Sequence, residues 1–301
     1  MHHLLFLLLS FVWGSNFILM KKASLAFGPL TVSAGRVTGG AIMLAMVWQL
    51  QKDKHWPFKK SDWLALSFVV FFGFIWPYTT QPYLIGKFGE SGFFALVISL
   101  VPLMTIIVSV PMLRVLPTVR QTIGVMGGLG FIALLFYDGL FERSITPGGL
   151  ALAVTVPLCY ATVNTFVKRR FAHVAPMSMA CICLFLSAIV MVPAGVSNET
   201  IQTDHENFPL AVGAMIVFGL IGTGVSTFMF YRLLMDRGPL WASMTAYLVP
   251  VVGLAWGWVD HEIVTLTQVI AFAGILTMVA LVQFERRMER AVDVDEPLLE
   301  S

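Results

Sequence analysis

Charged residues are scarce in this sequence. They make up 12% of 301 residues, about half the share found in a typical soluble domain, whereas 57% of the residues are hydrophobic and the mean hydropathy is +0.83. All 17 acidic residues fall in loops, in tails or at the ends of apolar segments, and none of the six histidines lies in the middle of one. The composition excludes a soluble globular protein, and the buried carboxylate or imidazole of a proton-coupled carrier is not evident.

The sequence also lacks the signatures of catalysis and of metal binding. It has no HExxH, Gly-x-Ser-x-Gly or P-loop motif, and the glycine-rich run at 127–130 is not followed by a lysine. Cys159, Cys181 and Cys183 lie in apolar segments, at neither disulfide nor metal spacing. We therefore expect a protein that is not an enzyme and that has no cofactor, no metal site and no nucleic-acid partner.

Long apolar segments are the dominant feature that is present. About 18 residues of helix suffice to cross the hydrocarbon core of a bilayer, and about ten segments reach that length. The fold class predicted is an all-α integral membrane protein. The expected spans are residues 3–20, 30–50, 63–83, 91–113, 119–138, 148–167, 176–196, 210–233, 239–259 and 266–284.

The distribution of basic residues predicts the orientation. If the N-terminus is cytoplasmic, 14 of the 19 Lys and Arg residues lie in inside segments and four lie outside, with Arg36 inside a span. This bias predicts that both termini are cytoplasmic. The first span has no basic residue before it, and Lys21 and Lys22 stand where a signal peptidase would need small residues, so we expect it to stay in the mature protein.

The two halves of the chain resemble each other at a constant offset of 148 residues. This offset carries Asn16 onto Asn164, Tyr83 onto Tyr231, and the Leu-Val-Pro at 100–102 onto the one at 248–250. Five spans per copy make the repeats inverted, since the second copy enters the membrane from the opposite side. We predict a first five-helix repeat over 1–146, a second, inverted one over 147–290, and an acidic, disordered cytoplasmic tail over 291–301.

Inverted repeats favour a transporter, because a symmetric scaffold can open a central cavity to one side and then to the other. A polar side chain within an apolar span is costly unless it is bonded or faces water. Asn16 and Asn164 fit a shared cavity, with Trp13 and Tyr160 near the same helix faces. The alternative is that each asparagine only bonds a neighbouring helix and holds the bundle together.

The third span is the most irregular and suggests further lining residues. Pro77 and Pro82 interrupt it, and a kinked helix is tolerated in a membrane where freed carbonyls meet protein, water or ligand. We expect Trp76, Thr80 and Tyr83 to line the cavity; the alternative is a kink that serves packing alone.

Prolines and one arginine are candidates for movement and for charge recognition. Pro102 and Pro250 occupy matching places in the two repeats and, with Pro77 and Pro82, are candidate gating hinges or static bends. Arg36 lies about six residues into its span. We expect its side chain to snorkel to the outer surface; the alternatives are pairing with a substrate carboxylate or with a helix C-terminus.

Several short motifs together resemble a known family. They are "WGSNF" in the first span followed by Lys21 or Lys22, Pro29 and Arg36 leading into the second, "SLVPL" at 99–103, and "YLVPV" followed by Glu262. In this order they are similar to the EamA family of the drug/metabolite transporter superfamily. The resemblance covers nearly the whole chain and implies ten helices in two inverted five-helix repeats around a central cavity. Leu113 and Arg114 stand where many repeats of that family have Glu-Arg.

The aromatic amino acid exporter is the nearest analogy within that family. It implies that Trp13, Trp76, Tyr83, Tyr160 and Trp241 line an aromatic cavity. The function expected is alternating-access transport of small metabolites, amino acids or similar amphipathic molecules, by an exporter or facilitator, monomeric or homodimeric, in the inner (plasma) membrane. The alternatives are a proton-coupled multidrug or other metabolite exporter using Glu90 or Asp236, and a membrane scaffold or intramembrane enzyme on the same fold.

Overall fold

The computed structural model of the protein describes five stretches of the chain, residues 2–50, 57–88, 97–135, 146–259 and 266–283. Within these stretches every regular element is helical, which confirms the predicted all-helical fold. The predicted tail at 291–301 and the residues Glu90, Asp138 and Glu262 lie outside the described part of the chain.

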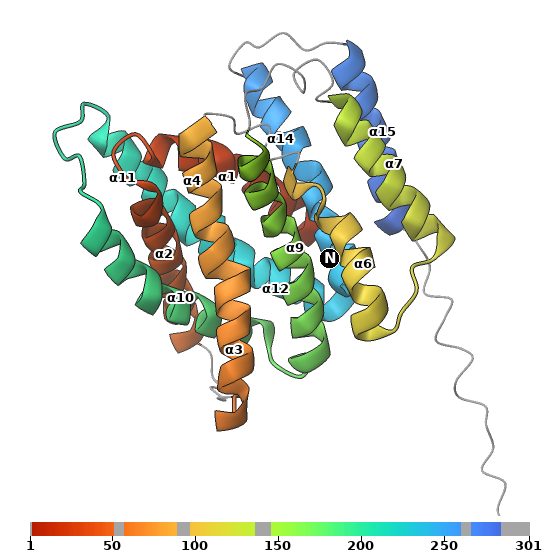
Figure 1. Ribbon diagram of the computed structural model, residues 1–301, viewed down its shortest axis with the longest axis horizontal. Helices are drawn as coiled ribbons and strands as arrows, with labels where there is room; N and C mark the ends of the chain where they lie inside the picture. The colour runs from red at the N-terminus through yellow and green to blue at the C-terminus, as the bar shows by residue number, and fades with distance from the viewer. Residues whose placement is uncertain (1, 51–56, 89–96, 136–145, 260–265, 284–301) are drawn as a thin grey trace, which may run out of the picture.

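Figure 1 shows the order of the helices along the chain. In chain order they are α1 (His2–Ala23), α2 (Pro29–Gln49), η1 (Lys60–Asp62), α3 (Trp63–Val70), η2 (Phe71–Ile75), α4 (Trp76–Phe88), α6 (Val101–Leu113), α7 (Val119–Leu135), α9 (Pro147–Arg170), α10 (Pro176–Asn198), α11 (Phe208–Val217), η3 (Phe218–Val225), α12 (Ser226–Arg237), α13 (Pro239–Ser243), α14 (Thr245–Val259) and α15 (Leu266–Gln283).

Six helical stretches in the described residues are long and apolar enough to cross a bilayer, which gives the chain its membrane-protein character. The other four expected spans fall on shorter apolar helices, three of which border residues outside the described part. The six long stretches are His2–Ala23, Pro29–Gln49, Lys60–Lys87, Pro147–Arg170, Pro176–Asn198 and Phe208–Arg237.

Proline determines where several of these helices begin. Pro29, Pro147 and Pro176 are the first residues of α2, α9 and α10. Proline is favoured there because its fixed φ suits a helix and its missing N–H belongs to the first turn, which has no intrahelical acceptor. At the start of α9 the hydroxyl of Thr146 also accepts a hydrogen bond from the backbone N–H of Gly149, at 3.2 Å.

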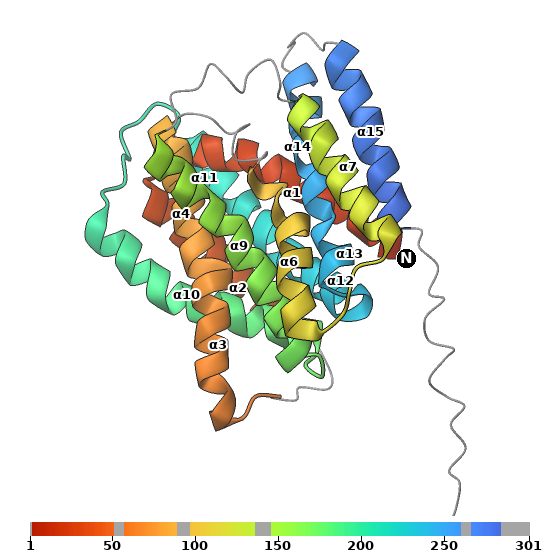
Figure 2. The same ribbon diagram turned by 45° about the vertical axis from the view of Figure 1, so that its right-hand side comes forward.

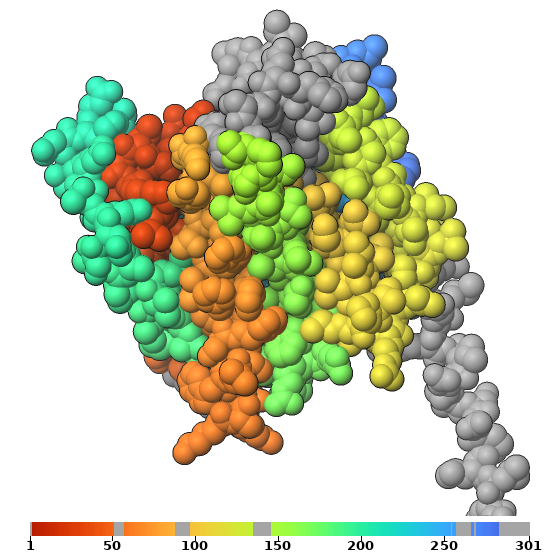
Figure 3. Space-filling model, viewed as in Figure 1, coloured from red at the N-terminus to blue at the C-terminus, as the bar shows by residue number. Residues whose placement is uncertain are grey.

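Helices from the two halves pack on each other in a reciprocal pattern. Helix α1 packs on α14 and helix α9 packs on α6, while α2 contacts η3 and α10 contacts η2. The contact of α1 with α14 thus corresponds to that of α9 with α6, and the contact of α2 with η3 corresponds to that of α10 with η2, each shifted by about half of the chain. Helices α7 and α15 form a further pair, which lies to one side of the molecule in Figures 1 and 2. On the face shown in Figure 3, α4, α9 and α6 lie side by side.

Two of the long stretches contain a π-helical segment at matching positions. The offset of 148 moves η2, residues 71–75, onto residues 219–223 of η3. A π turn bonds residue i to i+5, and such turns occur frequently at functional sites. Both π segments supply residues to the cavity described below.

Close approach of two backbones holds α2 against η3. A Cβ atom added to Gly39 would lie 2.9 Å from the Cα of Gly219, and one added to Gly40 would lie 3.0 Å from the backbone N of Gly224. Without side chains at these positions, the helices meet backbone to backbone, as small residues allow in membranes. Leucine or alanine at these positions has no room.

Replacing Gly39 tests this contact. We expect Gly39→Ala to lower the stability of the protein by about 1–3 kcal/mol, the usual cost of overpacking, and to lower its melting temperature in detergent. Gly130→Ala is the matched control, because a Cβ at Gly130 meets nothing within 4 Å and alanine is the better helix former. Equal melting temperatures for the two variants would contradict the close crossing.

Candidate functional site

A cavity of about 110 Å³ lies between the two halves of the bundle. On a scale where one water needs roughly 10–15 Å³, this is room for a small organic molecule. Among the residues expected to bind substrate, the cavity wall contains Trp13, Asn16, Tyr160 and Asn164, and Arg36 joins them. The wall is built from α1, α2, α4, α9, both π segments and the helices that follow η3.

Arg36 is the charged residue in the described wall of the cavity. Its side chain is not at the surface: the residue is only 6% exposed, so the snorkelling interpretation is wrong. The guanidinium lies 3.7 Å from the ring centroid of Tyr78 and 4.3 Å from that of Phe218. Its Nε donates a hydrogen bond to Thr223 Oγ1 at 3.2 Å.

The rings compensate part of the cost of burying this cation. Removing an ion from water costs several kcal/mol in a protein, and a desolvated cation–π contact returns about 2 kcal/mol. The rings of Tyr78 and Phe218 both lie over the guanidinium carbon, and the Thr223 hydroxyl accepts a hydrogen bond from Nε. Within the described residues, the two Nη groups of Arg36 have no hydrogen-bond acceptor and no carboxylate partner. The arrangement can therefore accept an anionic group.

Two contacts outside the cavity position Arg36. One turn earlier on α2, the hydroxyl of Ser33 donates to the carbonyl of Tyr78 at 2.5 Å, which ties α2 to the helix that carries the stacking ring. At the start of α2, the carboxylate of Glu199 accepts hydrogen bonds from the backbone N–H groups of Leu30 and Thr31, at 2.9 and 2.8 Å. A carboxylate at a helix N-terminus is favoured by the free N–H groups and by the helix dipole.

Asn16 has both of the roles that the sequence left open. It lines the cavity, and its amide nitrogen donates a hydrogen bond to the carbonyl of Gly222 at 2.8 Å. Gly222 lies in η3, and a Cβ added to it would lie 2.3 Å from Asn16 Oδ1. The π segment and its glycine thus let α1 approach the second half of the chain.

Asn164, its counterpart in the second repeat, differs. It is 7% exposed and lines the same cavity, but its side-chain amide has no hydrogen-bond partner among the described residues. An unbonded amide in an apolar bundle is costly unless it meets water or a ligand. Among the described residues, Asn164 thus keeps its whole side-chain amide unbonded, whereas Asn16 keeps only its Oδ1 unbonded.

The residues beside Asn16 interrupt the apolar run for other reasons. A Cβ on Gly14 would lie 2.4 Å from Val252 Cβ, so glycine is needed where α1 crosses α14. Ser15 donates to the carbonyl of Phe11 at 2.8 Å and accepts from Trp256 Nε1 at 2.9 Å. Only the asparagine of the Gly-Ser-Asn cluster belongs to the cavity.

Aromatic side chains supply a large part of the remaining wall. The rings of Trp13 and Phe230 lie 5.1 Å apart, within the usual range for aromatic pairs. The hydroxyl of Tyr160 accepts a hydrogen bond from Gln81 Nε2 at 3.0 Å, which joins α9 to α4. The wall is therefore apolar and rigid, with a few fixed polar groups.

Four residues expected in the cavity lie outside it. Trp76 donates its Nε1–H to Thr155 Oγ1 at 2.8 Å, Thr80 is buried in the protein away from the cavity wall, and Tyr83 is 48% exposed. Trp241 packs against Phe6, with ring centroids 5.2 Å apart. For these four the structure does not bear out cavity lining.

The helical period explains the difference in the third span. The wall takes Phe74, Tyr78 and Gln81, spaced i, i+4 and i+7 on one helix face. Thr80 and Tyr83 point to other faces. Sequence reasoning missed these lining residues, along with Phe218, Phe230 and Tyr231; the spacing of Phe74, Tyr78 and Gln81 was a usable signal.

The four candidate hinge prolines occupy two kinds of place. Pro82 and Pro250 lie inside α4 and α14, where each removes a backbone hydrogen bond. Pro77 is the second residue of α4, just after the π segment η2, and Pro102 is the second residue of α6, just after a turn at 99–100. Pro102 therefore begins a helix and does not bend one. The hinge role stays a prediction.

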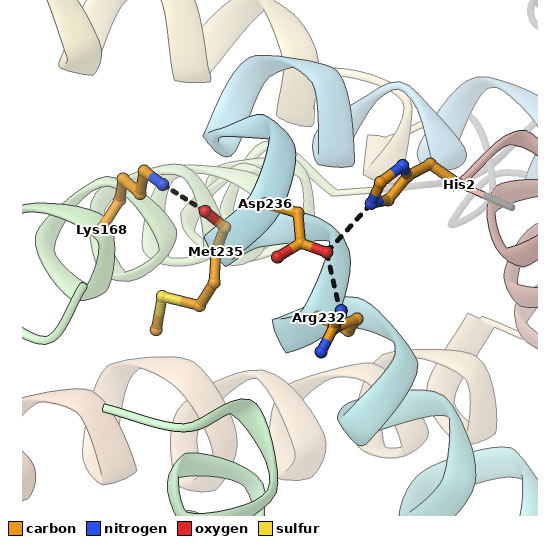
Figure 4. Close-up of polar contacts among 5 residues, drawn as sticks. All are labelled: His2, Lys168, Arg232, Met235 and Asp236. Atoms are coloured by element: carbon orange, nitrogen blue, oxygen red, sulfur yellow. Dashed lines mark hydrogen bonds and ion pairs between the residues drawn. The ribbon is translucent and has the colours of Figure 1, made fainter. Parts of the chain in front are cut away.

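A polar cluster joins the two halves at the end of the bundle that carries the N-terminus of α1 (Figure 4). Asp236 accepts hydrogen bonds from His2 at 3.0 Å and from Arg232 at 2.8 Å, and Lys168 of α9 donates to the carbonyl of Met235. Asp236 is thus engaged at a helix end and is absent from the cavity wall.

Comparison with known proteins identifies the family of this chain. The sequence model of the EamA-like transporter family matches residues 1–137 and, a second time, residues 147–284. The chain belongs to the EamA-like transporter family.

Individual relatives of this EamA-like protein agree with that assignment. YoaV of Bacillus subtilis (strain 168), described as an uncharacterized transporter, is 24% identical over 260 residues, which cover 85% of this chain and 87% of YoaV. YyaM of the same organism, described in the same words, is 22% identical over 285 residues, or 91% and 92% of the two chains. A solved crystal structure shares the fold, with a TM-score of 0.73 over 93% of this chain and 96% of its own at 17% identity.

The two asparagines of this EamA-like transporter differ in a way that stability can test. We expect Asn16→Leu to destabilise the protein by about 0.6 kcal/mol, the average measured for hydrogen bonds between membrane helices, and by no more than about 1.7 kcal/mol, because the bond to Gly222 is lost. Asn164→Leu loses no hydrogen bond within the described residues and should melt within error of the parent. The measurement is thermal unfolding in detergent. A larger drop for Asn164→Leu would show that the assignment of roles is reversed.

Proposed function

We propose that this EamA-like protein is an alternating-access carrier that moves small metabolites, amino acids or similar amphipathic molecules, as an exporter or facilitator. Family membership supports transport, and the cavity carries the rest of the proposal. Both halves of the chain contribute to its wall, which combines a buried guanidinium at Arg36 and an unbonded amide at Asn164 with aromatic side chains. Such a mixture of an apolar surface and a few convergent polar groups is typical of small-molecule sites.

The finer architecture is proposed as ten membrane helices in two inverted five-helix repeats, over 1–146 and 147–290. The two matches of the family model support two repeats. The reciprocal packing of α1 with α14 and of α9 with α6, and the matching places of η2 and η3, support a pseudo-two-fold relation between them. Such symmetry gives a carrier two related states.

The proposed setting is the inner (plasma) membrane, with both termini cytoplasmic. The excess of basic residues in the segments on that side supports it. In this orientation the contact of Asp236 with His2 joins α12 to α1 at the cytoplasmic end of the bundle. Opening to the cytoplasm then requires α1 and α12 to separate there.

Facilitated transport is proposed in preference to proton coupling. In the described part of the chain, no acidic residue lines the cavity, and Asp236 is held by an arginine and a histidine at a helix end. A carrier without a buried titratable group moves its substrate down the electrochemical gradient of that substrate. An imposed pH gradient should therefore drive no uphill accumulation of substrate in liposomes.

Counterflow in proteoliposomes tests the proposed function. Vesicles are loaded with each of a panel of amino acids, and exchange of external tracer is followed. We expect exchange of a few related amino acids and its loss in Asn164→Leu. Thr162→Val is the matched control on the same helix, because Thr162 bonds only the carbonyl of Leu158 in its own helix, at 2.8 Å.

Each outcome bears on a different part of the proposal. No exchange with any amino acid, in folded protein, contradicts the proposed substrate class and leads to drugs and other metabolites. Exchange that survives in Asn164→Leu contradicts the role of that residue. Uphill accumulation driven by a pH gradient favours the proton-coupled exporter. A cavity variant whose yield of folded protein falls while the transport activity of the folded fraction is unchanged favours a scaffold.

A further inference from the structure

The charge of the cavity is one-sided. Arg36 contributes a buried positive charge, and the described wall holds no carboxylate to balance it. Three carboxylates of the described residues are engaged elsewhere: Asp236 with His2 and Arg232, Asp62 with Arg170 at 3.0 Å, and Glu199 with the first backbone N–H groups of α2. A buried ion without a counter-ion is incomplete, so the missing partner is expected to enter with the substrate.

Arg36, Tyr160 and Asn164 offer hydrogen-bond donors to the cavity, and among the described residues the unpartnered Oδ1 of Asn16 is an acceptor there. The Nη groups of Arg36 are unpartnered within the described residues, and a planar guanidinium edge matches the two oxygens of a carboxylate. The hydroxyl of Tyr160 already accepts from Gln81, which leaves its own proton for another acceptor. Asn164 adds an amide with no partner in the described chain. Within the described part of the wall, a substrate ammonium group finds no carboxylate.

We propose that the transported species is a monoanionic carboxylate with an aromatic or branched apolar body, whose carboxylate pairs with Arg36 and which needs no ammonium group. The inference rests on the proposed transport function and names the charge class of its substrate. The rings of Trp13, Phe74 and Phe230 receive the apolar body. The hydroxy acid and keto acid analogues of apolar amino acids have this chemistry.

A consequence follows for the driving force. Each turnover carries one net negative charge across the membrane while Arg36 stays in the protein. An inside-negative potential then drives the anion outward, with an equilibrium gradient of about 50-fold for each 100 mV. Export needs no proton-binding residue in the cavity, which agrees with the absence of an acid from the described wall.

Two trios of matched compounds test the charge class. Phenyllactate, phenylalanine and phenylalaninol share one aromatic body and are respectively an anion, a zwitterion and a cation; 2-hydroxyisocaproate, leucine and leucinol form the aliphatic trio. Binding to the purified full-length protein is measured by calorimetry. Charge movement is measured as current from proteoliposomes on a solid-supported membrane after a concentration jump, with protein-free liposomes as the blank.

We expect at least one hydroxy acid to bind more tightly than the matching amino acid and to produce a current with the sign of an entering anion. The amino alcohols should not bind. Arg36→Gln should weaken binding of the hydroxy acid by about 10- to 100-fold, the value of hydrogen bonds to a charged group. Arg36→Lys should restore part of it, and Arg120→Gln, at an exposed position of α7, should change nothing.

Amino alcohols that bind as tightly as hydroxy acids, hydroxy acids that give no current, or Arg36→Gln with parental affinity would each overturn the inference. If Arg36→Gln does not fold, the binding and current measurements with the six compounds on the parent protein test the inference instead. Amino acid counterflow without preference for the anions overturns this inference alone. If folded protein neither binds any of the six compounds nor exchanges any amino acid of the panel, both the inference and the proposed function fail.

Discussion

The burial of one guanidinium between two aromatic rings is the constraint on which the centre of this structure depends. Arg36 comes from α2, Tyr78 from α4 and Phe218 from η3, so the stack joins three segments distant in the sequence. The backbone of α2 is held beside it by the bond from Ser33 to the carbonyl of Tyr78. Membrane helices gain little from apolar contact alone, and a stacked cation with one charged hydrogen bond is a specific way to hold them in register.

Duplication and the π segments account for the rest of the site. The two π segments lie at equivalent places in the two halves. Helix α2 packs on η3, and helix α10 packs on η2. In the second half the Gly222 carbonyl is bonded by Asn16, whereas Asn164 keeps its amide unbonded within the described residues. Symmetric sequence positions have thus acquired unequal roles: both asparagines line the cavity, but among the described residues only Asn16 also bonds the other half of the chain.

Sequence patterns predicted the helical fold and part of the cavity. Asn16 and Asn164 were recognisable because an amide within an apolar span must be bonded or face a cavity, and Trp13 and Tyr160 followed from helical spacing. The faces of the third span were predicted incorrectly for Trp76, Thr80 and Tyr83. The helical spacing of Phe74, Tyr78 and Gln81 marks the face that lines the cavity, and Thr80 and Tyr83 lie off that face. The burial of Arg36 depends on neighbours from other segments, which spacing along α2 cannot reveal.

Locating a bound anion is the most direct test of the central claim that Arg36 completes its charge pairing with a ligand. A crystal structure of the protein with 3-(4-bromophenyl)lactate would place the ring by the anomalous signal of bromine. We expect bromine among Trp13, Phe74 and Phe230 and the carboxylate within about 3 Å of the Arg36 Nη atoms. A bound ligand whose carboxylate lies away from Arg36, or a structure in which a protein carboxylate pairs with this guanidinium, would contradict it.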